Sequence, residues 1–572
     1  MANQNQVRIL DQWGHPFAPS RQRGVVGPPR MRALNGSPNI PYDAADIYGG
    51  QMADWRPYLW SPDGEMSFGQ RDRIVARARD AERNDGWAKG GVTKILDTVI
   101  GANFRPISKP DYRALAYFTG IKGFDAVWAD EFGHAIDACW RTWAGDINHY
   151  CDGMQCLTMA QLCWVAMRHN LLDGDALGGL LYRPELLGPG KARYATALQL
   201  IDPDRLSNPQ LTFDKNVMRG GVEVDNFGVP EGYWIRRAHA GDWFNAAKSV
   251  HWDYFPRRTP WGRPIIVHSF DHDRAGQHHG GAGVLTSVLQ RMRMLMRYDS
   301  AEMEAAIINA IFAAYVKSPY DPQMVAEAMD SDHAEETALG AYQEQRNEFW
   351  DERKRMWLGG SQVTHLFPGE EIGQVRAERP ASNYEPFEVQ VLRHIASGMG
   401  ITYEQISGDF SRTNFSSFRG ATNEVKKTFD RRAKNFDSGF FMPVRGAAVE
   451  EFMDVEDVPL PAGAPPFEEF RLAYSSCRLL RPGRGWTNPL DEIRASGLAM
   501  QYGLSTLEEQ AADAMGEDWE EIVDQRAIEI QRFKDRGLEL PEVYQGPPTP
   551  PEAAPGGRPG SKPDGGKIGS GG

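Results

Sequence analysis

Cysteine, positive charge and long apolar runs are all scarce in this sequence. The five cysteines are few and odd in number for a disulfide framework, so a reducing compartment is expected. Lysine and arginine total 63 against 77 aspartates and glutamates, a net charge of −14. That balance disfavours a non-specific nucleic-acid binder, which normally carries a basic excess. Residues 305–316 form the longest apolar-leaning run, too short for a membrane span. Residues 1–16 contain no apolar signal core, so we expect a soluble, cytosolic product.

The sequence motifs of common enzyme classes are also missing. The stretch GPGKAR at residues 188–193 lacks the spacing of a phosphate-binding loop and has no Ser or Thr after its lysine. Neither HExxH nor GxSxG occurs anywhere in the chain. We therefore expect no catalytic activity and no cofactor.

Two groups of residues have the chemistry of metal ligands but not the spacing. The first is a set of histidines whose separations match no familiar ligand pattern: His268, His272, His278 and His279. Adjacent histidines point in different directions on most backbones, so partly exposed loop imidazoles are the preferred interpretation. The second set is His149, Cys151 and Cys156, and here free cysteine is usually a small buried apolar residue. We expect no metal site.

Helical and strand-like patterns alternate along the first half of the chain. Residues 1–65, rich in Gly, Pro and aromatic residues, are expected to be an irregular arm. Residues 66–100 have helical spacing, and helical segments continue to about residue 172. Strand-like segments follow at residues 180–186, 195–202, 221–238 and 264–270. Helices followed by a sheet predict an α+β fold.

The second half opens with a long amphipathic helix, predicted over residues 284–311 because apolar residues recur there every three or four positions. A compact insert follows, with an expected strand at 313–316, a charged helix at 335–357 and a strand pair around HLFPGEEIGQV, residues 365–375. Further helices are predicted over residues 385–399 and 420–436. A polar stretch rich in Ser, Thr, Asn and Gly separates these two helices.

The C-terminal region is predicted to be helical over residues 489–537, with breaks at 504–505 and at 516. Its acidic stretch, residues 508–521, is most simply a solvated helix face. From residue 541 onward Gly, Pro, Ser and Lys dominate, which predicts a disordered tail.

Several motifs resemble one known family. The most specific is IASGMGITYEQISGDFSRTNFSSFRGA, residues 395–421, and others are YDAADIYGGQMADW at 42–55 and CDGMQCLTMAQLCWVAMRHNLLDGDALGGLLYRP at 151–184. HSFDHDRAGQHHGGAGVL, residues 268–285, is similar to a family turn, with Ala275 in place of proline and His279 in place of arginine. On these motifs the chain resembles the portal proteins of lambda-type tailed phages over most of its length.

The resemblance implies a structural protein of the virion that assembles in the host cytoplasm. Copies of such a protein form a ring, usually a dodecamer, at one capsid vertex. The ring is a conduit for DNA packaging and ejection and connects head to tail. The implied partners are the terminase large subunit, the major capsid protein or scaffold, a head-completion or adaptor protein, and double-stranded DNA without sequence specificity. No membrane partner is implied.

The resemblance also implies a portal fold with a wing of helices and sheet, a two-helix stem, a small α/β clip and a helical crown. The predicted segments fit that order. They are an N-terminal arm (1–65), wing (66–280), first stem helix (281–312), clip (313–382), second stem helix (383–400), tunnel loop (401–418), a long helix returning to the wing (419–485), crown (486–540) and disordered tail (541–572).

A ring of tunnel loops would surround DNA and contact phosphates without holding them tightly. Hydroxyl and amide groups suit that role because their hydrogen bonds to phosphate carry no sequence information, whereas many Lys and Arg would bind strongly through counterion release. The candidate DNA-channel residues are Ser411, Arg412, Thr413, Asn414, Ser416 and Ser417. The alternative is that residues 407–417 form an inter-subunit contact or a helix-capping turn, with Asp409 and Ser411 as the cap residues.

The predicted first stem helix carries three arginines away from its apolar stripe: Arg291, Arg293 and Arg297. They could face DNA, or pair with acids such as Glu302 or Glu388 of a neighbouring subunit. Two other functions also stay open. Another capsid-associated ring or scaffold would generally be shorter, and a nucleic-acid translocase would need the phosphate-cradling loop that is missing here.

Overall fold

The computed structural model describes residues 54–310, 314–317, 348, 356–358, 361–363, 371–374, 381–411, 413–483, 485–486 and 488–538. The chain divides into two compact units, Met1–Ser61 and Pro62–Gly572. In the first unit, where the irregular arm was expected, only residues 54–61 are described, and the rings of Tyr58 and Trp60 lie 5.9 Å apart. Within the described part, no helix is both long enough and apolar enough to cross a bilayer.

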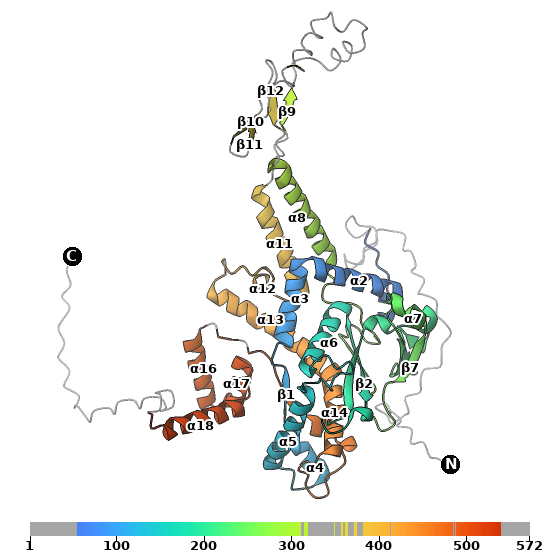
Figure 1. The fold of residues 1–572 in the computed structure, drawn as a ribbon, viewed down its shortest axis with the longest axis vertical. Coiled ribbons are helices and arrows are strands. Elements are labelled where there is room, and N and C mark those ends of the chain that lie inside the picture. The colour runs from blue at the N-terminus through green and yellow to red at the C-terminus, as the bar shows by residue number, and fades with distance from the viewer. Residues whose placement is uncertain are drawn as a thin grey trace, which may run out of the picture. The chain divides into compact units, whose positions relative to one another are not determined.

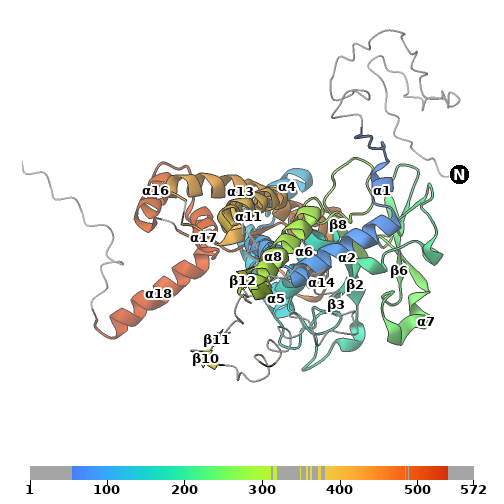
Figure 2. The same ribbon diagram turned by 90° about the horizontal axis from the view of Figure 1, so that it is seen from above.

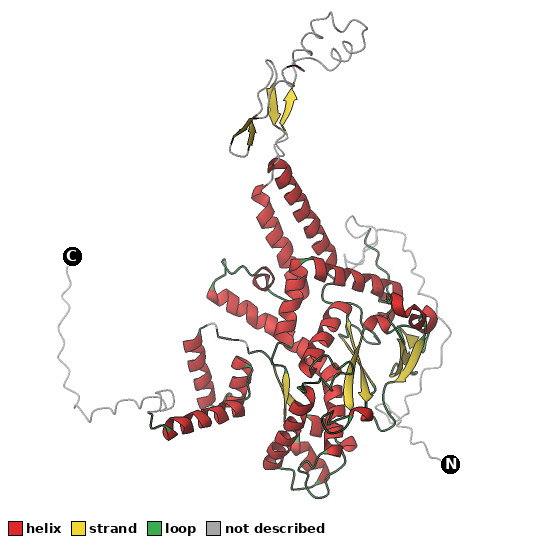
Figure 3. Cartoon of the chain, in the orientation of Figure 1, coloured by secondary structure: helices red, strands yellow, loops and turns green. Residues whose placement is uncertain are grey.

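The second unit has the expected α+β composition, with helices packed around small antiparallel sheets (Figure 3). The helices up to the long insert are α1 (Pro62–Glu65), α2 (Phe68–Asn84), α3 (Gly86–Val99), α4 (Tyr112–Thr119), α5 (Ala126–Ala144), α6 (Met159–Asp173), α7 (Ala246–Ser249) and α8 (Leu289–Ala310). Those after it are α11 (Ala381–Met399), α12 (Tyr403–Ser407), α13 (Phe415–Phe436), α14 (Met442–Val455), α15 (Arg471–Ser475), α16 (Pro489–Gln501), α17 (Leu507–Met515) and α18 (Trp519–Asp535). A π-helical turn, η7 (Asp437–Phe441), joins α13 to α14.

We call the second unit without α8, α11, the insert between them and α16–α18 the body. Two sheets form its β part, and all their strand pairs are antiparallel. The first has the order β3-β2-β8 and consists of β3 (Thr196–Ile201), β2 (Asp175–Tyr182) and β8 (Ile266–Phe270). The second has the order β4-β5-β6-β7 and consists of β4 (Met218–Arg219), β5 (Val222–Val224), β6 (Pro230–Arg236) and β7 (Trp252–Pro256). A separate pair joins β1 (Arg105–Ser108) to β13 (Cys477–Leu480) and so links the two ends of the body.

Two helices replace the single one expected over residues 66–100. Asp85 has extended backbone angles, and its side chain accepts hydrogen bonds from the amides of Trp87 and Ala88. A carboxylate in that position caps a new helix because it satisfies amides that have no partner in the first turn. The chain therefore ends α2 and begins α3 at this aspartate.

The main apolar core lies among α3, α5, α6, α11, α13 and α14, and it contains a chain of aromatic contacts. Phe441 packs edge-on against Phe104 at 5.2 Å, and Trp140 packs against Trp143 at 5.1 Å. A smaller core joins the two sheets through eight buried residues, Leu177, Ile201, Leu206, Val222, Val224, Tyr233, Ile235 and Ile266. Cys151 and Cys163 are buried in the main core, as expected for free cysteines, and all five cysteines are unpaired. The same expectation is wrong for Cys156, which is exposed.

Helices α8 and α11 lie side by side, one on each side of the insert in sequence (Figures 1 and 2). The Tyr384 hydroxyl donates to Asp299 at 2.7 Å, and the Tyr384 ring stacks on Tyr298 at 5.6 Å. Helix α8 begins at Leu289, later than predicted. Met292 is 1% exposed whereas Met303 is 67% exposed, so the burial of the apolar stripe decreases between these two positions.

The insert between these helices contains two small strand pairs. β9 (Ala314–Lys317) pairs with β12 (Glu371–Gln374), and β10 (Met356–Leu358) pairs with β11 (Ser361–Val363). The charged helix predicted for residues 335–357 falls mostly outside the described residues. Its predicted end is wrong, because Met356 and Trp357 belong to β10. The tail at 541–572 also falls outside the described residues.

Candidate functional site

The polar stretch between α11 and α13 is shorter than predicted and contains the short helix α12. Thr402 and Gln405 form a capping box that starts α12, and Gly408 ends that helix in the left-handed region with φ of 69°. Helix α13 begins at Phe415, earlier than the predicted residue 420. The connecting segment is therefore residues 408–414, and both of its ends are fixed by helix termini.

Asn414 is the N-cap of α13, since its side-chain oxygen accepts the Ser417 amide at 2.8 Å. The capping alternative therefore applies to Asn414, whereas Asp409 and Ser411 do not cap a helix. Asp409 instead accepts the Ser411 amide at 2.9 Å inside the turn. The Thr413 hydroxyl donates to Glu404 at 3.2 Å, which ties the end of the segment back to α12.

The predicted channel residues that are described lie together at the surface. Ser411, Asn414 and Ser417 are exposed, and Thr413 is half-buried. Ser416 lies in the first turn of α13, and Arg412 falls outside the described residues. Phe410 is 52% exposed and packs edge-on against Phe418 at 5.4 Å, a contact that the sequence argument did not anticipate. The segment thus presents hydroxyl and amide groups on a turn held by an aromatic pair.

The three arginines of α8 are exposed, and among the described residues none of them forms an ion pair within one subunit. Arg293 and Arg297 line a shallow hollow on α8 together with Met296, Ser300 and Glu304. The guanidinium groups are therefore exposed at the surface of α8, and whether they face DNA or a neighbouring subunit stays a prediction.

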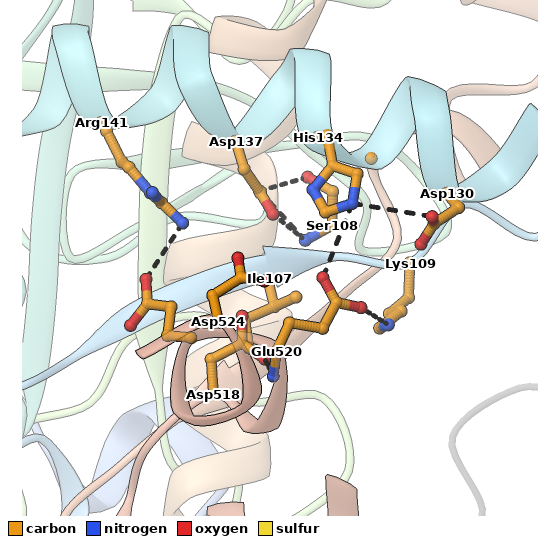
Figure 4. A pocket seen from close by; sticks show the side chains of 12 residues that line it. Ile107, Ser108, Lys109, Asp130, His134, Asp137, Arg141, Asp518, Glu520 and Asp524 are labelled. Atoms are coloured by element: carbon orange, nitrogen blue, oxygen red, sulfur yellow. Dashed lines mark hydrogen bonds and ion pairs between the residues drawn. The ribbon is translucent and has the colours of Figure 1, made fainter. Parts of the chain in front are cut away.

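A second polar region was missed by the sequence argument, which took residues 508–521 for a solvated face. The acids of α17 and α18 pair with cations of β1, α5 and β13. Figure 4 shows the part of this contact around His134, Arg141 and Glu520. Arg105 donates to Glu521 at 3.0 Å, Arg141 donates to the same carboxylate at 3.2 Å, and Lys109 lies 3.8 Å from Glu508. Lys109, Arg141 and Glu521 are among the residues that line a cavity of about 160 Å³ between α5 and α18. Within the described part, no residue of α16–α18 joins either apolar core.

The charges across this contact are asymmetric, because the body supplies the cations and the C-terminal helices supply most of the acids. Hydrogen bonds from Arg105 lower the pKa of Glu521, so its contribution to docking is present above the usual glutamate pKa and falls away as pH drops through the lowered value. Burial raises the pKa of Glu520, which lies 3.6 Å from His134. A contact of this kind depends on ionic strength.

We predict that added salt loosens the C-terminal helices from the body before the body unfolds. The screening length falls from about 10 Å at 0.1 M salt to about 3 Å at 1 M, which weakens partly exposed ion pairs. Limited proteolysis within residues 482–488, which join β13 to α16, should therefore become faster with salt. Replacing Arg105 with Met should produce fast cleavage already at low salt.

The matched control for that experiment is Arg237→Met, which removes an exposed guanidinium paired with Asp253 at 2.8 Å in the second sheet. This variant should cleave like the unmodified chain. Equal cleavage of both variants at low salt would show that Arg105 does not hold the C-terminal helices.

The family and the curated relatives that match this chain agree with each other. The family described as phage portal protein, lambda family, matches residues 48–432. Portal protein B of Escherichia phage lambda is 29% identical over 534 residues, covering 90% of this chain and 94% of that protein. The portal protein of Escherichia phage N15 is 28% identical over 497 residues, covering 86% of this chain and 90% of that protein. A chain in the virion of a native gene transfer agent particle aligns with a TM-score of 0.33 at 14% identity, covering 73% of this chain and 98% of that chain.

Proposed function

The chain belongs to the lambda family of phage portal proteins, and we propose that twelve copies form a ring at one capsid vertex through which double-stranded DNA enters and leaves the head. The relatives are structural proteins of phage virions, so this chain is assigned to the virion as a connector. The same proposal includes assembly in the host cytoplasm and docking of the terminase large subunit. It also includes contacts with the major capsid protein or scaffold and with a head-completion or adaptor protein.

The order of the elements supports a division into portal parts. The body with its two sheets would be the wing, and the pair α8 and α11 would be the stem. The strand pairs of the insert would be the clip, residues 408–414 the tunnel loop, and α16–α18 the crown. The observation that carries this assignment is the pairing of two helices around a strand-containing insert, followed after the short helix α12 by an exposed polar turn.

The polar turn suits a channel that DNA must slide through. Exposed hydroxyl and amide groups exchange hydrogen bonds among successive phosphates, and these bonds carry no sequence information. A chain with net charge −14 also avoids the tight, salt-dependent binding that a basic channel would produce. The exposed arginines of α8 would then pair with acids of the next subunit or contribute a mild attraction for DNA.

We predict that the purified full-length chain forms rings with a central hole and does not hydrolyse ATP. The physical reason is that the sequence contains no phosphate-cradling loop, so packaging energy must come from a separate motor. Negative-stain microscopy tests the ring, and a phosphate-release assay on the same sample tests the hydrolysis.

The two readouts separate the alternatives. Globular monomers with ATP hydrolysis would contradict the portal assignment and favour a translocase. Small rings that neither fill heads with DNA nor bind terminase in a packaging extract would favour a different capsid-associated ring.

A further inference from the structure

Strand β7 is the last strand of the second sheet (Figure 1), and among the described residues no strand pairs with its outer side. Its hydrogen bonding to β6 is fixed at its end, where the amide of Arg257 donates to the carbonyl of Glu231 at 2.8 Å. Backbone groups in an antiparallel pair alternate between the two sides of a strand. Those of Trp252 and Tyr254 therefore point away from β6, toward the open edge.

This edge is exposed and only partly protected. The side chain of Tyr254 is 42% exposed and that of Phe255 is 37% exposed. Proteins usually protect a free edge with charges, proline or a covering segment. Pro256 has no amide to offer, so it protects the last position of the strand alone. The backbone groups that remain are of the kind with which many domains take up an extended peptide as an added strand.

Two exposed aromatic side chains lie in the connection that leads into this strand. Trp243 is 91% exposed and Phe244 is 100% exposed. The turn that carries them is held by Asp242, whose carboxylate accepts the amides of Phe244 at 3.0 Å and of Asn245 at 3.3 Å. Aromatic side chains lose little conformational freedom on binding, and tryptophan is frequent among the residues that dominate protein interfaces. This turn therefore offers apolar contacts to a partner.

Three arginines gather beyond the other end of the strand. Arg257 and Arg258 follow β7 directly and begin a hairpin, in which Arg258 bridges to Pro264. Arg471 of α15 reaches the same hairpin and donates to the carbonyl of Trp261 at 2.7 Å. Burial, together with the positive charges of Arg257 and Arg471, lowers the pKa of Arg258. None of the described acids forms an ion pair with any of the three arginines.

A fourth arginine of this hairpin shows what the other three lack. Arg263 lies 3.3 Å from Glu450, and the same carboxylate accepts the indole N–H of Trp261 at 3.1 Å. Glu450 is therefore already bound on both of its oxygens. The remaining guanidinium groups lie at the surface with their charge open to an acid from another molecule.

We propose that the open edge of β7 and the arginines beyond it bind an extended, acidic segment of a partner protein. The segment would add a strand to the second sheet and place carboxylates opposite Arg257, Arg258 and Arg471. Charge complementarity selects this occupant, because guanidinium and carboxylate groups form short, charge-assisted hydrogen bonds. A free strand edge favours a polypeptide over DNA, which has no strand to add.

The charge changes along the strand, and this change sets the pattern of the partner. Burial, together with Glu223 and Glu231, raises the pKa of Tyr254, so acids of a partner would be repelled beside this tyrosine. They would be attracted at the hairpin that follows. The segment should therefore carry its acids at one end and neutral residues along the middle of the strand.

A second copy of this chain fits the edge less well. Two β7 strands that paired with each other would form a twofold contact, whereas a closed ring is built from contacts between different surfaces. The inference deepens the proposed contacts with other virion proteins, and it rests on the proposed function for the partner's identity. Peptide binding is measured without a head or a ring, so its failure and the failure of the portal assignment are distinguishable.

The test is fluorescence anisotropy with the full-length chain and a short labelled peptide, in which glutamates precede an alternation of valine and threonine. Such β-branched residues favour an extended backbone. Binding should be at least about tenfold tighter than that of the same peptide with lysines in place of the glutamates. N-methylation of the valines and threonines should abolish binding, because it removes the backbone donors of the added strand.

The combined change Arg257→Gln and Arg258→Gln should weaken peptide binding about tenfold, as expected for the loss of two partly exposed charge pairs. The matched control is Arg494→Gln with Arg532→Gln, which removes two exposed guanidinium groups from the C-terminal helices. It should bind the peptide like the unmodified chain. Equal binding by the two double variants, or no preference for glutamate over lysine in the peptide, would overturn the proposal.

Two further measurements would reveal a different occupant. The first uses labelled duplex DNA, and DNA binding that is lost with Arg257→Gln and Arg258→Gln in the absence of peptide binding would make this a polyanion site and refute the proposal. The second scores rings by microscopy. We expect intact rings in both double variants, and ring loss confined to the Arg257 and Arg258 variant would assign the surface to a neighbouring subunit instead.

Discussion

Replacing Arg445 with Ala should lower the free energy of unfolding of the body by about 3–5 kcal/mol, the usual result of breaking a buried charged contact. Arg445 on α14 is fully buried. Its Nε donates to the carbonyl of Ser475 at 2.9 Å, and its Nη2 donates to the hydroxyl of Ser108 at 2.6 Å. The guanidinium also lies over the Trp140 ring, 5.2 Å from its centre. One side chain therefore joins α14, β1, α5 and the end of α15.

The loss extends beyond these contacts because Ser108 is itself part of a chain of hydrogen bonds. Its hydroxyl donates to Asp137 at 2.6 Å, and burial already raises the pKa of that carboxyl. Without Arg445, the charge of Asp137 would lose an attractive neighbour in a buried setting, and two acceptors would lose their donor. Alanine would also leave a cavity beside Trp140.

Urea denaturation of the full-length chain, followed by tryptophan fluorescence, measures this effect. The matched control is Arg494→Ala on α16, which removes an exposed guanidinium and should change stability by no more than about 0.5 kcal/mol. A loss below about 1 kcal/mol for Arg445→Ala would mean that water replaces the guanidinium contacts and that this network does not hold the body together.

Sequence periodicity correctly predicted those helices whose apolar spacing along the sequence matches the way they pack in the folded chain. The helix pair around the insert and the C-terminal helices with breaks near residues 504 and 516 were found close to their expected positions. The break at Asp85 was missed although the sequence Asp-Gly was visible, because the apolar spacing continues across it. The later start of α8 could not be predicted, because residues 284–288 are held by the contact of Val284 with Leu171, which is distant in sequence.

In the candidate sites, too, local features could be predicted from the sequence, whereas contacts between distant residues could not. The polar turn could be located from composition, since Ser, Thr, Asn and Gly cluster there between two helices. The sequence alone does not decide which residue caps α13, because Asp409, Ser411 and Asn414 are all good cap residues. The ion pair of Arg105 with Glu521 unites residues far apart in sequence, so no spacing rule could reveal it.

Replacing Asn414 with Asp should leave rings intact and sharply reduce the fraction of heads filled with DNA, if residues 408–414 line the channel. Aspartate caps a helix as well as asparagine does, so the bond to the Ser417 amide is retained and α13 keeps its start. Each added carboxylate that comes within about 4 Å of a phosphate costs about 1 kcal/mol even in bulk water. That cost repeats around the ring and for every turn of DNA that passes.

If the turn serves only to cap α13, Asn414→Ala should weaken the rings, which Asn414→Asp should leave intact. Alanine removes the cap and should cost about 1 kcal/mol in each subunit. The loss would be repeated in every subunit, so rings should dissociate more readily. A simultaneous change of Arg412 and Asn414 to Ala would mix both effects, because Asn414 is a cap as well as a candidate contact. The aspartate and alanine variants keep them separate.

Thr506→Asp is the matched control for charge. Thr506 is the N-cap of α17, so aspartate there retains a cap and adds the same charge away from the polar turn. Each variant is purified, rings are scored by microscopy, and DNA-filled heads are then counted in a packaging assay. Normal filling with Asn414→Asp, together with ring loss in Asn414→Ala, would assign the turn to helix capping and remove it from the channel. Reduced filling with Asn414→Asp but not with Thr506→Asp would place the turn against DNA, because both changes keep a helix cap and add one negative charge, at the turn in one case and at α17 in the other.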